Sequence, residues 1–156
     1  MTDNSARAIE AARGLGLEVT VTRHGPVRSL QEAAAARGLD AHQIVKTMVV
    51  RVSEGDFRFV LVPGDREIAW PKLRALLGVN RVSMPDAEAA YAVTGYVRGT
   101  ITPLGSESPL PVVADASVTG TVSIGAGAPG VALTVDAATL LAALDASVAD
   151  VTEPTG

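Results

Sequence analysis

One strand-like stretch carries the side chain whose chemistry is easiest to define, a lysine set among apolar residues. Residues 43–50 read QIVKTMVV, a composition typical of a buried strand. Successive side chains of a strand point to opposite faces, so Lys46 shares an apolar face with Ile44, Met48 and Val50. An ammonium group on such a face either extends past it to reach water or faces a cavity that holds an anion or a polarised oxygen. The pattern alone leaves both interpretations open.

Two glycine-rich segments are the other places where the chain could approach a ligand. In residues 95–105, Arg98 and Gly99 together could bind an anion, although a solvated arginine fits the pattern equally well. Residues 125–130 match G-x-G-x-x-G, but the dinucleotide fingerprint needs a helix at its third glycine, and here residues 131–135 read as a strand. We therefore reject a dinucleotide site. The segment is either a ligand-facing loop or a plain hairpin turn.

The remaining chemistry of the sequence is defined by what it lacks. There are no cysteines and only two histidines, His24 and His42, which excludes disulfides, thiolate zinc sites and a cysteine nucleophile. Neither histidine belongs to an HExxH motif, and no G-x-S-x-G elbow is present. We expect no metal and no cofactor, with His24 as a turn or rim residue and His42 on an exposed helical turn. If the protein is an enzyme, its catalysis must rest on positioning, on backbone donors and on a group of the substrate.

Length and composition indicate one globular domain. The chain has 156 residues, 47% of them hydrophobic and 19% charged, with a net charge of −4. These values predict a single folded, soluble domain over residues 1–156 with no membrane partner. Residues 1–13 are polar and lack the basic start and apolar centre of a secretion signal, so we expect a cytoplasmic protein. The acidic balance argues against a broad basic surface for nucleic acid, and 3% aromatic residues provide no base-stacking platform. A local contact with an RNA end remains compatible with both.

Hydrophobic periodicity and capping residues predict a mixed α+β domain. We expect helices from Asp3 or Ser5 to about Leu15, then over 30–37 after a Ser29 capping box, over 71–77 with Leu73, Leu76 and Leu77 buried, over 86–94, and from 136 with Leu140, Leu141, Leu144 and Val148 buried. Strands are expected at residues 18–23, 43–50, 57–62, 79–84, 111–114, 121–124 and 131–135.

Several short motifs occur in an order that points to a family. They are His24 and Pro26 before an alanine-rich helix, QIVKTMV at 43–49, LVPGD at 61–65, TGYVRG at 94–99, TPLG at 102–105 and GAPG at 127–130. In this order and spacing they resemble the YbaK/EbsC family of aminoacyl-tRNA deacylases, relatives of the editing domain inserted in bacterial prolyl-tRNA synthetase. The resemblance covers residues 16–151.

The resemblance implies a fold, a reaction and a set of site residues. The implied fold is a mixed, mainly antiparallel and partly barrel-like sheet flanked by helices. The implied reaction is trans-editing: hydrolysis of the ester bond of mischarged aminoacyl-tRNA, most often tRNA(Pro) carrying cysteine or alanine, without metal. The attacking water is assisted by the terminal ribose hydroxyl or by a substrate thiol. The aminoacyl-tRNA 3′ end and prolyl-tRNA synthetase are the implied partners.

The implied site centres on Lys46, which anchors the tRNA end or stabilises developing negative charge. Gly99 and the loop 127–130 would offer backbone amides to the substrate carbonyl and to the amino acid. The full set of implied residues is Lys46 and Gly99 as catalytic, with His24, Thr47, Arg98, Thr100, Gly127, Pro129 and Gly130 as substrate-binding.

The chain also departs from the family pattern. Thr100 stands where many members have a second glycine, and Gly125 stands where some have serine. The resemblance therefore does not identify the amino acid that is edited. Two rival hypotheses remain: a non-catalytic module of the same fold that binds a tRNA end, a nucleotide or a synthetase, and a structural domain whose lysine merely reaches solvent.

Overall fold

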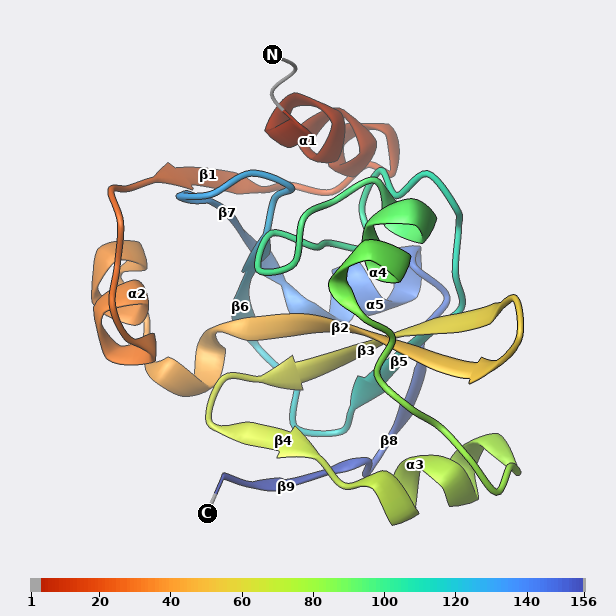
Figure 1. Ribbon diagram of the computed structural model, residues 1–156. Helices are drawn as coiled ribbons and strands as arrows, with labels where there is room; N and C mark the ends of the chain where they lie inside the picture. The colour runs from red at the N-terminus through yellow and green to blue at the C-terminus, as the bar shows by residue number, and fades with distance from the viewer. Residues whose placement is uncertain (1–3, 156) are drawn as a thin grey trace.

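The computed structural model describes residues 4–155 and has the mixed α+β architecture expected from the sequence (Figure 1). The helices are α1 Asn4–Gly14, α2 Leu30–Arg37, the short 3-10 turn η1 Ala41–Gln43, α3 Trp70–Leu77, α4 Ala87–Thr94 and α5 Ala137–Ala143. The strands are β1 Thr20–Arg23, β2 Val45–Ser53, β3 Asp56–Pro63, β4 Arg66–Ile68, β5 Val112–Asp115, β6 Thr121–Gly125, β7 Val131–Asp136, β8 Ser147–Ala149 and β9 Thr152–Pro154. The alternative helix start at Asp3 lies outside the described residues.

The strands form three sheets, ordered β2-β3-β5-β8, β1-β7-β6 and β4-β9. Antiparallel pairing predominates, and among the strand pairs of residues 4–155 only β3–β5 and β5–β8 are parallel. Between the two larger sheets, β2 meets β6 at a single parallel bridge, Ile44 with Ser123. Because one bridge does not make a ladder, the expected barrel-like closure is absent from the part of the chain that the structure describes.

Helix ends follow the capping residues of the sequence. The Ser29 hydroxyl accepts a hydrogen bond from Glu32 N at 3.1 Å, and Gly38 ends α2 in a left-handed conformation. The Glu32 carboxylate bonds to Arg28 N instead of Ser29 N, so only half of the expected capping box forms. The longest helix, α1, has 11 residues. No helix within residues 4–155 is long and apolar enough to cross a membrane.

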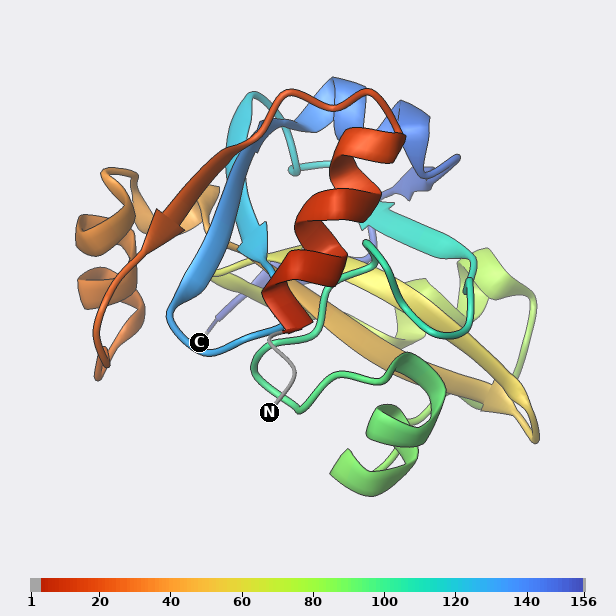
Figure 2. The ribbon, with the colours of Figure 1, turned by 90° about the horizontal axis from the view of Figure 1, so that it is seen from above.

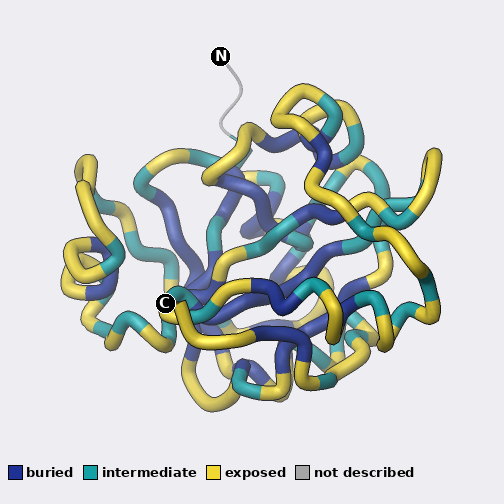
Figure 3. The backbone as a smooth tube through the Cα atoms, turned by 60° about the horizontal axis from the view of Figure 1, so that its bottom comes forward, coloured by how far each residue is buried: buried dark blue, intermediate teal, exposed yellow. Residues whose placement is uncertain are grey.

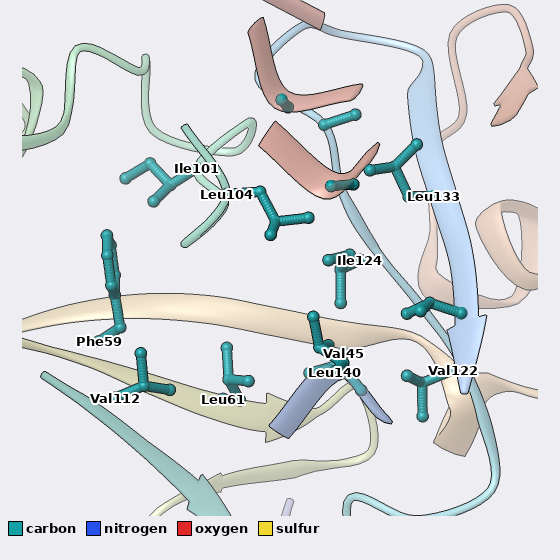
Figure 4. Close-up of a cluster of buried hydrophobic side chains, with 14 of the residues drawn as sticks. Val45, Phe59, Leu61, Ile101, Leu104, Val112, Val122, Ile124, Leu133 and Leu140 are labelled. Atoms are coloured by element: carbon teal, nitrogen blue, oxygen red, sulfur yellow. The ribbon is translucent and has the colours of Figure 1, made fainter. Parts of the chain in front are cut away.

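The main core lies between the two larger sheets and is closed by α1 and α5 (Figures 1 and 2). In Figure 4, Phe59 and Leu61 rise from the β2-β3-β5-β8 sheet, here called the central sheet, toward Ile101 and Leu104, and Val45 points toward Ile124. A second, smaller cluster on the opposite face joins β2 and β3 to Leu73 of α3 and to Val151. The second half of β3 and all of β5 are therefore buried on both faces, and dark stretches mark the buried parts of the chain in Figure 3. The hairpin between β2 and β3 projects from this core.

Several sequence predictions were wrong, and each error concerns pairing or burial that depends on distant residues. Strand 79–84 does not form, because only Ser83 bridges to Arg51. Strands β4, β8 and β9 were missed. Leu76 and Val148, expected inside, are 43% and 56% exposed. Val148 lies in β8 rather than in a continued last helix, because α5 ends at Ala143.

Asp115, at the end of β5, fastens the C-terminal segment to the central sheet. The residue is 2% exposed, and its carboxylate accepts hydrogen bonds from Val151 N and Ser117 N, both at 3.0 Å, and from the Ser117 hydroxyl. Burial raises the pKa of Asp115, but the hydrogen bonds from Ser117, Val151 and Thr152 outweigh it and hold the pKa below its ordinary value. The folded state therefore prefers the ionised carboxylate.

We expect Asp115→Asn to lower the free energy of unfolding by about 2–4 kcal/mol at pH 7, because the amide group turns N–H donors against N–H donors. A lowered folded pKa means that Asp115 stabilises the fold above its unfolded pKa of about 3.9, and that this contribution is lost as the pH falls through the folded value. The difference in free energy of unfolding between wild type and Asp115→Asn, measured by denaturant titration, should therefore become smaller below about pH 4.

Asp150→Asn is the matched control for this prediction. Asp150 forms only an exposed ion pair with Lys72, with its side chain 66% exposed, so its replacement should change stability by less than about 1 kcal/mol. Equal effects of the two substitutions would contradict the role given to Asp115.

Candidate active site

A cavity opens beside the outer edge of β2, the strand that contains Lys46. On this edge β2 is bridged to β6 through Ile44 near its start and to Ser83 through Arg51 near its end. Between these bridges the described chain places no strand against it. The cavity has a volume of about 240 Å³ and is lined by Arg37, Ile44, Val45, Lys46, Thr47, Met48, Gly99, Ile101 and Gly125. We call it the β2-edge cavity.

Lys46 extends past its apolar face to the surface, one of the two conformations that its position allowed. The side chain is exposed, and Nζ donates a hydrogen bond to the Arg66 carbonyl of β4 at 2.9 Å. Lys46 also lines a second hollow of about 310 Å³ that contains Met48 and Trp70. The lysine thus stands on the rim shared by two hollows, and its flexible stem can carry the ammonium group toward either.

Thr47 presents an unsatisfied hydroxyl beside this cavity. Its Oγ1 is buried and has no hydrogen-bond partner, and it is alone in this among the side-chain atoms of the described residues. A buried hydroxyl without a partner costs about 1–3 kcal/mol. Since Thr47 lines the β2-edge cavity, a polar group of a bound molecule would relieve this cost.

Gly99 brings open backbone to the cavity from the loop that follows α4. Its φ is +93°, a conformation that favours glycine, and no atom lies within 4 Å of the place where a Cβ would stand. The structure therefore brings together three of the expected site residues, Lys46, Thr47 and Gly99, from two distant segments.

Three other expected residues turn toward the protein itself. Arg98 donates through Nη2 to the Pro85 carbonyl at 2.8 Å, and the Thr100 hydroxyl donates to the Val97 carbonyl at 2.7 Å. The Gly127 amide donates to the Thr100 carbonyl at 2.9 Å, so this donor is already used within the fold. None of the three lines the β2-edge cavity.

The loop 125–130 is a hairpin turn between β6 and β7, as one of its two interpretations held. Val131 opens β7, which confirms the rejection of a dinucleotide site. Pro129 is exposed, and the Gly130 carbonyl accepts a hydrogen bond from His24 N at 2.9 Å. Only Gly125, at the start of this turn, reaches the cavity.

The sequence reasoning missed Arg37, the last residue of α2, which also lines the cavity. Its Nη1 donates to the Ser123 hydroxyl at 3.1 Å, and its Nε lies 3.5 Å from His24 Nε2. Burial lowers the pKa of the Arg37 guanidinium. His24 therefore contacts a cavity residue without lining the cavity itself. In the sequence, an arginine in the last turn of an alanine-rich helix indicates only a favourable interaction with the helix dipole.

Comparison with known proteins shows the family of the chain. Residues 24–143 match the family model of the aminoacyl-tRNA editing domain, a range that contains every residue lining the cavity.

The chain belongs to the aminoacyl-tRNA editing domain family. Its similar relatives include proline--tRNA ligases of Pelobacter propionicus, 30% identical over 72% of this chain, and of Trichlorobacter lovleyi, 34% identical over 67%. The chain matches less than a fifth of the length of these ligases, 19% and 18%.

Solved structures match the editing domain over nearly its full length. One is described as a candidate trans-editing enzyme for prolyl-tRNA synthetase, with a TM-score of 0.87, 28% identity, and coverage of 98% of this chain and 99% of that one. Another, a scaffold used in computational epitope grafting, has a TM-score of 0.85 and 28% identity, with 99% of this chain covered and 100% of the other. The mixed α+β fold expected from the motifs is thereby confirmed, apart from the barrel-like closure.

Proposed function

We propose that the editing domain hydrolyses the ester bond of mischarged aminoacyl-tRNA, with Cys-tRNA(Pro) or Ala-tRNA(Pro) as its substrate. The observation that carries this proposal is the β2-edge cavity, where Lys46, an unsatisfied Thr47 hydroxyl and the open backbone of Gly99 meet. These groups suit a carbonyl that gains negative charge. No histidine or carboxylate lines the cavity to activate the Thr47 hydroxyl as a nucleophile. The ligase relatives and the trans-editing neighbour support proline-specific tRNA as the carrier.

In the proposed reaction the ester carbonyl lies in the β2-edge cavity. A water molecule adds to the carbonyl carbon, the carbonyl oxygen becomes an oxyanion, and the ester C–O bond then breaks. The proton lost by the water reaches the departing ribose oxygen through the neighbouring ribose hydroxyl or a substrate thiol, which gives a free amino acid and uncharged tRNA. The Lys46 ammonium stabilises the oxyanion, and Gly99 and Thr47 hold the substrate in place.

A third hollow, lined by three arginines, supports an RNA partner. It has a volume of about 400 Å³ and is lined by Arg51, Arg74 and Arg81 together with neutral residues. None of these arginines forms an ion pair within the described chain, whose ion pairs involve His42, Arg58, Arg66 and Lys72. Arg51 lies on β2 with Lys46, about 17 Å along the strand at 3.3–3.4 Å per residue. An RNA backbone could cross this hollow while its end enters the cavity.

Chemical logic favours a small edited side chain. A synthetase pocket shaped for proline rejects a smaller amino acid by only about 1–3 kcal/mol per missing methylene, so a separate sieve is needed. The proposed activity belongs in the cytoplasm with translation. Prolyl-tRNA synthetase would supply RNA affinity that a chain of net charge −4 lacks.

The deciding experiment is deacylation of tRNA(Pro) charged separately with alanine, cysteine, serine or proline, by the purified protein with and without prolyl-tRNA synthetase. We expect hydrolysis of the alanyl or cysteinyl ester at a rate at least tenfold above that of the prolyl ester. Binding of the charged tRNA without hydrolysis of any ester would refute the deacylase and favour the non-catalytic module of the same fold.

A further inference from the structure

Arg37 is a half-buried cation whose hydrogen-bonding capacity is only partly used. A guanidinium group has five N–H donors, and the contacts of Arg37 are the Ser123 hydroxyl at Nη1 and His24 at Nε. Nη2 has no protein acceptor in the described structure. No carboxylate of residues 4–155 lies within ion-pair distance of Arg37, since the ion pairs present involve other cations.

The surroundings of Arg37 favour an anion. The β2-edge cavity is lined by two cations, Arg37 and Lys46, and by no acidic residue, in a chain whose net charge is −4. Arg37 in the wall of the hollow and Lys46 on its rim both raise its potential, and the partial removal of Arg37 from water strengthens its attraction for an anion. A guanidinium fork matches the oxygens of a phosphodiester in particular.

The positions of His24 and Ser123 indicate that Arg37 is held in place for this purpose. Ser123 is fully buried in β6 and fixes Nη1 from one side. His24 Nδ1 lies 2.8 Å from the Gly25 carbonyl, and the tautomer with its proton on Nδ1 leaves Nε2 free to accept from Arg37 Nε. A guanidinium oriented in advance loses less conformational entropy when it binds a ligand.

We propose that Arg37 binds the phosphodiester that joins the terminal nucleotide of the RNA to the nucleotide before it. This inference rests on the proposed function, which places the ester of the terminal ribose beside Lys46 and Gly99. The phosphate attached to the 5′ oxygen of that ribose is the anion closest to the ester, so it lies within reach of the same cavity. Arg37 is thus a positioning residue: it orients the RNA end and takes no part in the bond-breaking step.

The test compares two uncharged RNA hairpins with single-stranded CCA ends. One has the natural terminal phosphodiester and the other a neutral methylphosphonate at that linkage. We expect wild-type protein to bind the neutral RNA about tenfold more weakly, the loss typical of one charged hydrogen-bonded contact. Arg37→Met should bind both RNAs with the same reduced affinity, whereas Arg13→Met, at an exposed arginine of α1, should behave as wild type.

Equal binding of the two RNAs by wild type would overturn the proposal, as would a tenfold difference that persists in Arg37→Met. The same midpoint of thermal unfolding for wild type and Arg37→Met shows that this variant is folded. Arg37→Lys, which keeps the charge but loses the guanidinium fork, should recover only part of the difference in affinity between the two RNAs. The binding assay needs no hydrolysis, so a failed deacylation assay beside an intact charge effect would refute the proposed enzyme and not the role of Arg37. On an active enzyme, Arg37→Met should raise KM about tenfold and change kcat less than threefold.

Discussion

Replacing Lys46 with alanine should lower kcat/KM for deacylation by a factor of about a hundred or more, the usual effect of removing one group that stabilises an oxyanion. The folded state should tolerate the change, because the side chain is exposed and its Nζ makes one hydrogen bond, to the Arg66 carbonyl. We expect the free energy of unfolding to change by less than about 1 kcal/mol. Single-turnover deacylation and denaturant unfolding on the same preparations measure the two effects.

Lys72→Ala is the matched control for Lys46→Ala. Lys72 is also exposed and also donates to a backbone carbonyl, that of Thr152, at 3.1 Å, but it lies outside both hollows that contain Lys46. Its removal should leave deacylation unchanged. If Lys46→Ala kept more than a tenth of the wild-type activity, the ammonium group would not be the main stabiliser of the oxyanion.

Gly130→Ala should be the most destabilising single methyl addition in the β6–β7 turn. The new Cβ would lie 2.4 Å from the His24 carbonyl oxygen, and φ at Gly130 is +72°. Backbone strain adds about 1–2 kcal/mol to the steric cost, so the free energy of unfolding should fall by about 3 kcal/mol or more. Because the backbone fixes the position of the Cβ and the contacting atom is a backbone oxygen, no rotamer change can relieve the overlap.

Gly120→Ala separates strain from steric overlap in this prediction. Gly120 has a similar φ of +68° with no atom within 4 Å of the added Cβ. Its replacement should therefore show the strain alone, about 1–2 kcal/mol. Equal unfolding midpoints for Gly120→Ala and Gly130→Ala would show that the close approach of His24 to the turn does not constrain the fold.

Features with a local physical cause were predictable from the sequence. Helix α2 begins after Ser29 and ends at Gly38, and α4 begins after Asp86 and ends at Gly95. These ends could be predicted because a capping residue interacts only with neighbours a few residues away. The β2–β3 hairpin follows from an acidic glycine turn between two β-branched runs. For such elements the hydrogen-bond partners that decide the structure lie close together in the sequence.

Features that depend on distant partners were not predictable. Strands β4 and β9 have three residues each and are far apart in the sequence, although they pair in space, Arg66 with Pro154 and Ile68 with Thr152. Each is too short to show a hydrophobic alternation that would predict a strand. The meeting of Lys46 with Gly99 was predicted from the order of the family motifs and not from periodicity. Arg37 had no such signal, because its importance comes from a cavity that tertiary structure creates.

The pairing of β4 with β9 links the end of the chain to the lysine. The Lys46 ammonium bonds to the carbonyl of Arg66, whose guanidinium bonds to Thr152 at 2.6 Å, and Arg66 pairs with Pro154. Strand β9 lies after residue 143, where the family match ends. Strand β9 therefore stabilises the observed position of Lys46, because loss of the β4–β9 pairing would displace the Arg66 carbonyl that accepts the hydrogen bond from the ammonium group. It does so although no residue of β9 lines the β2-edge cavity.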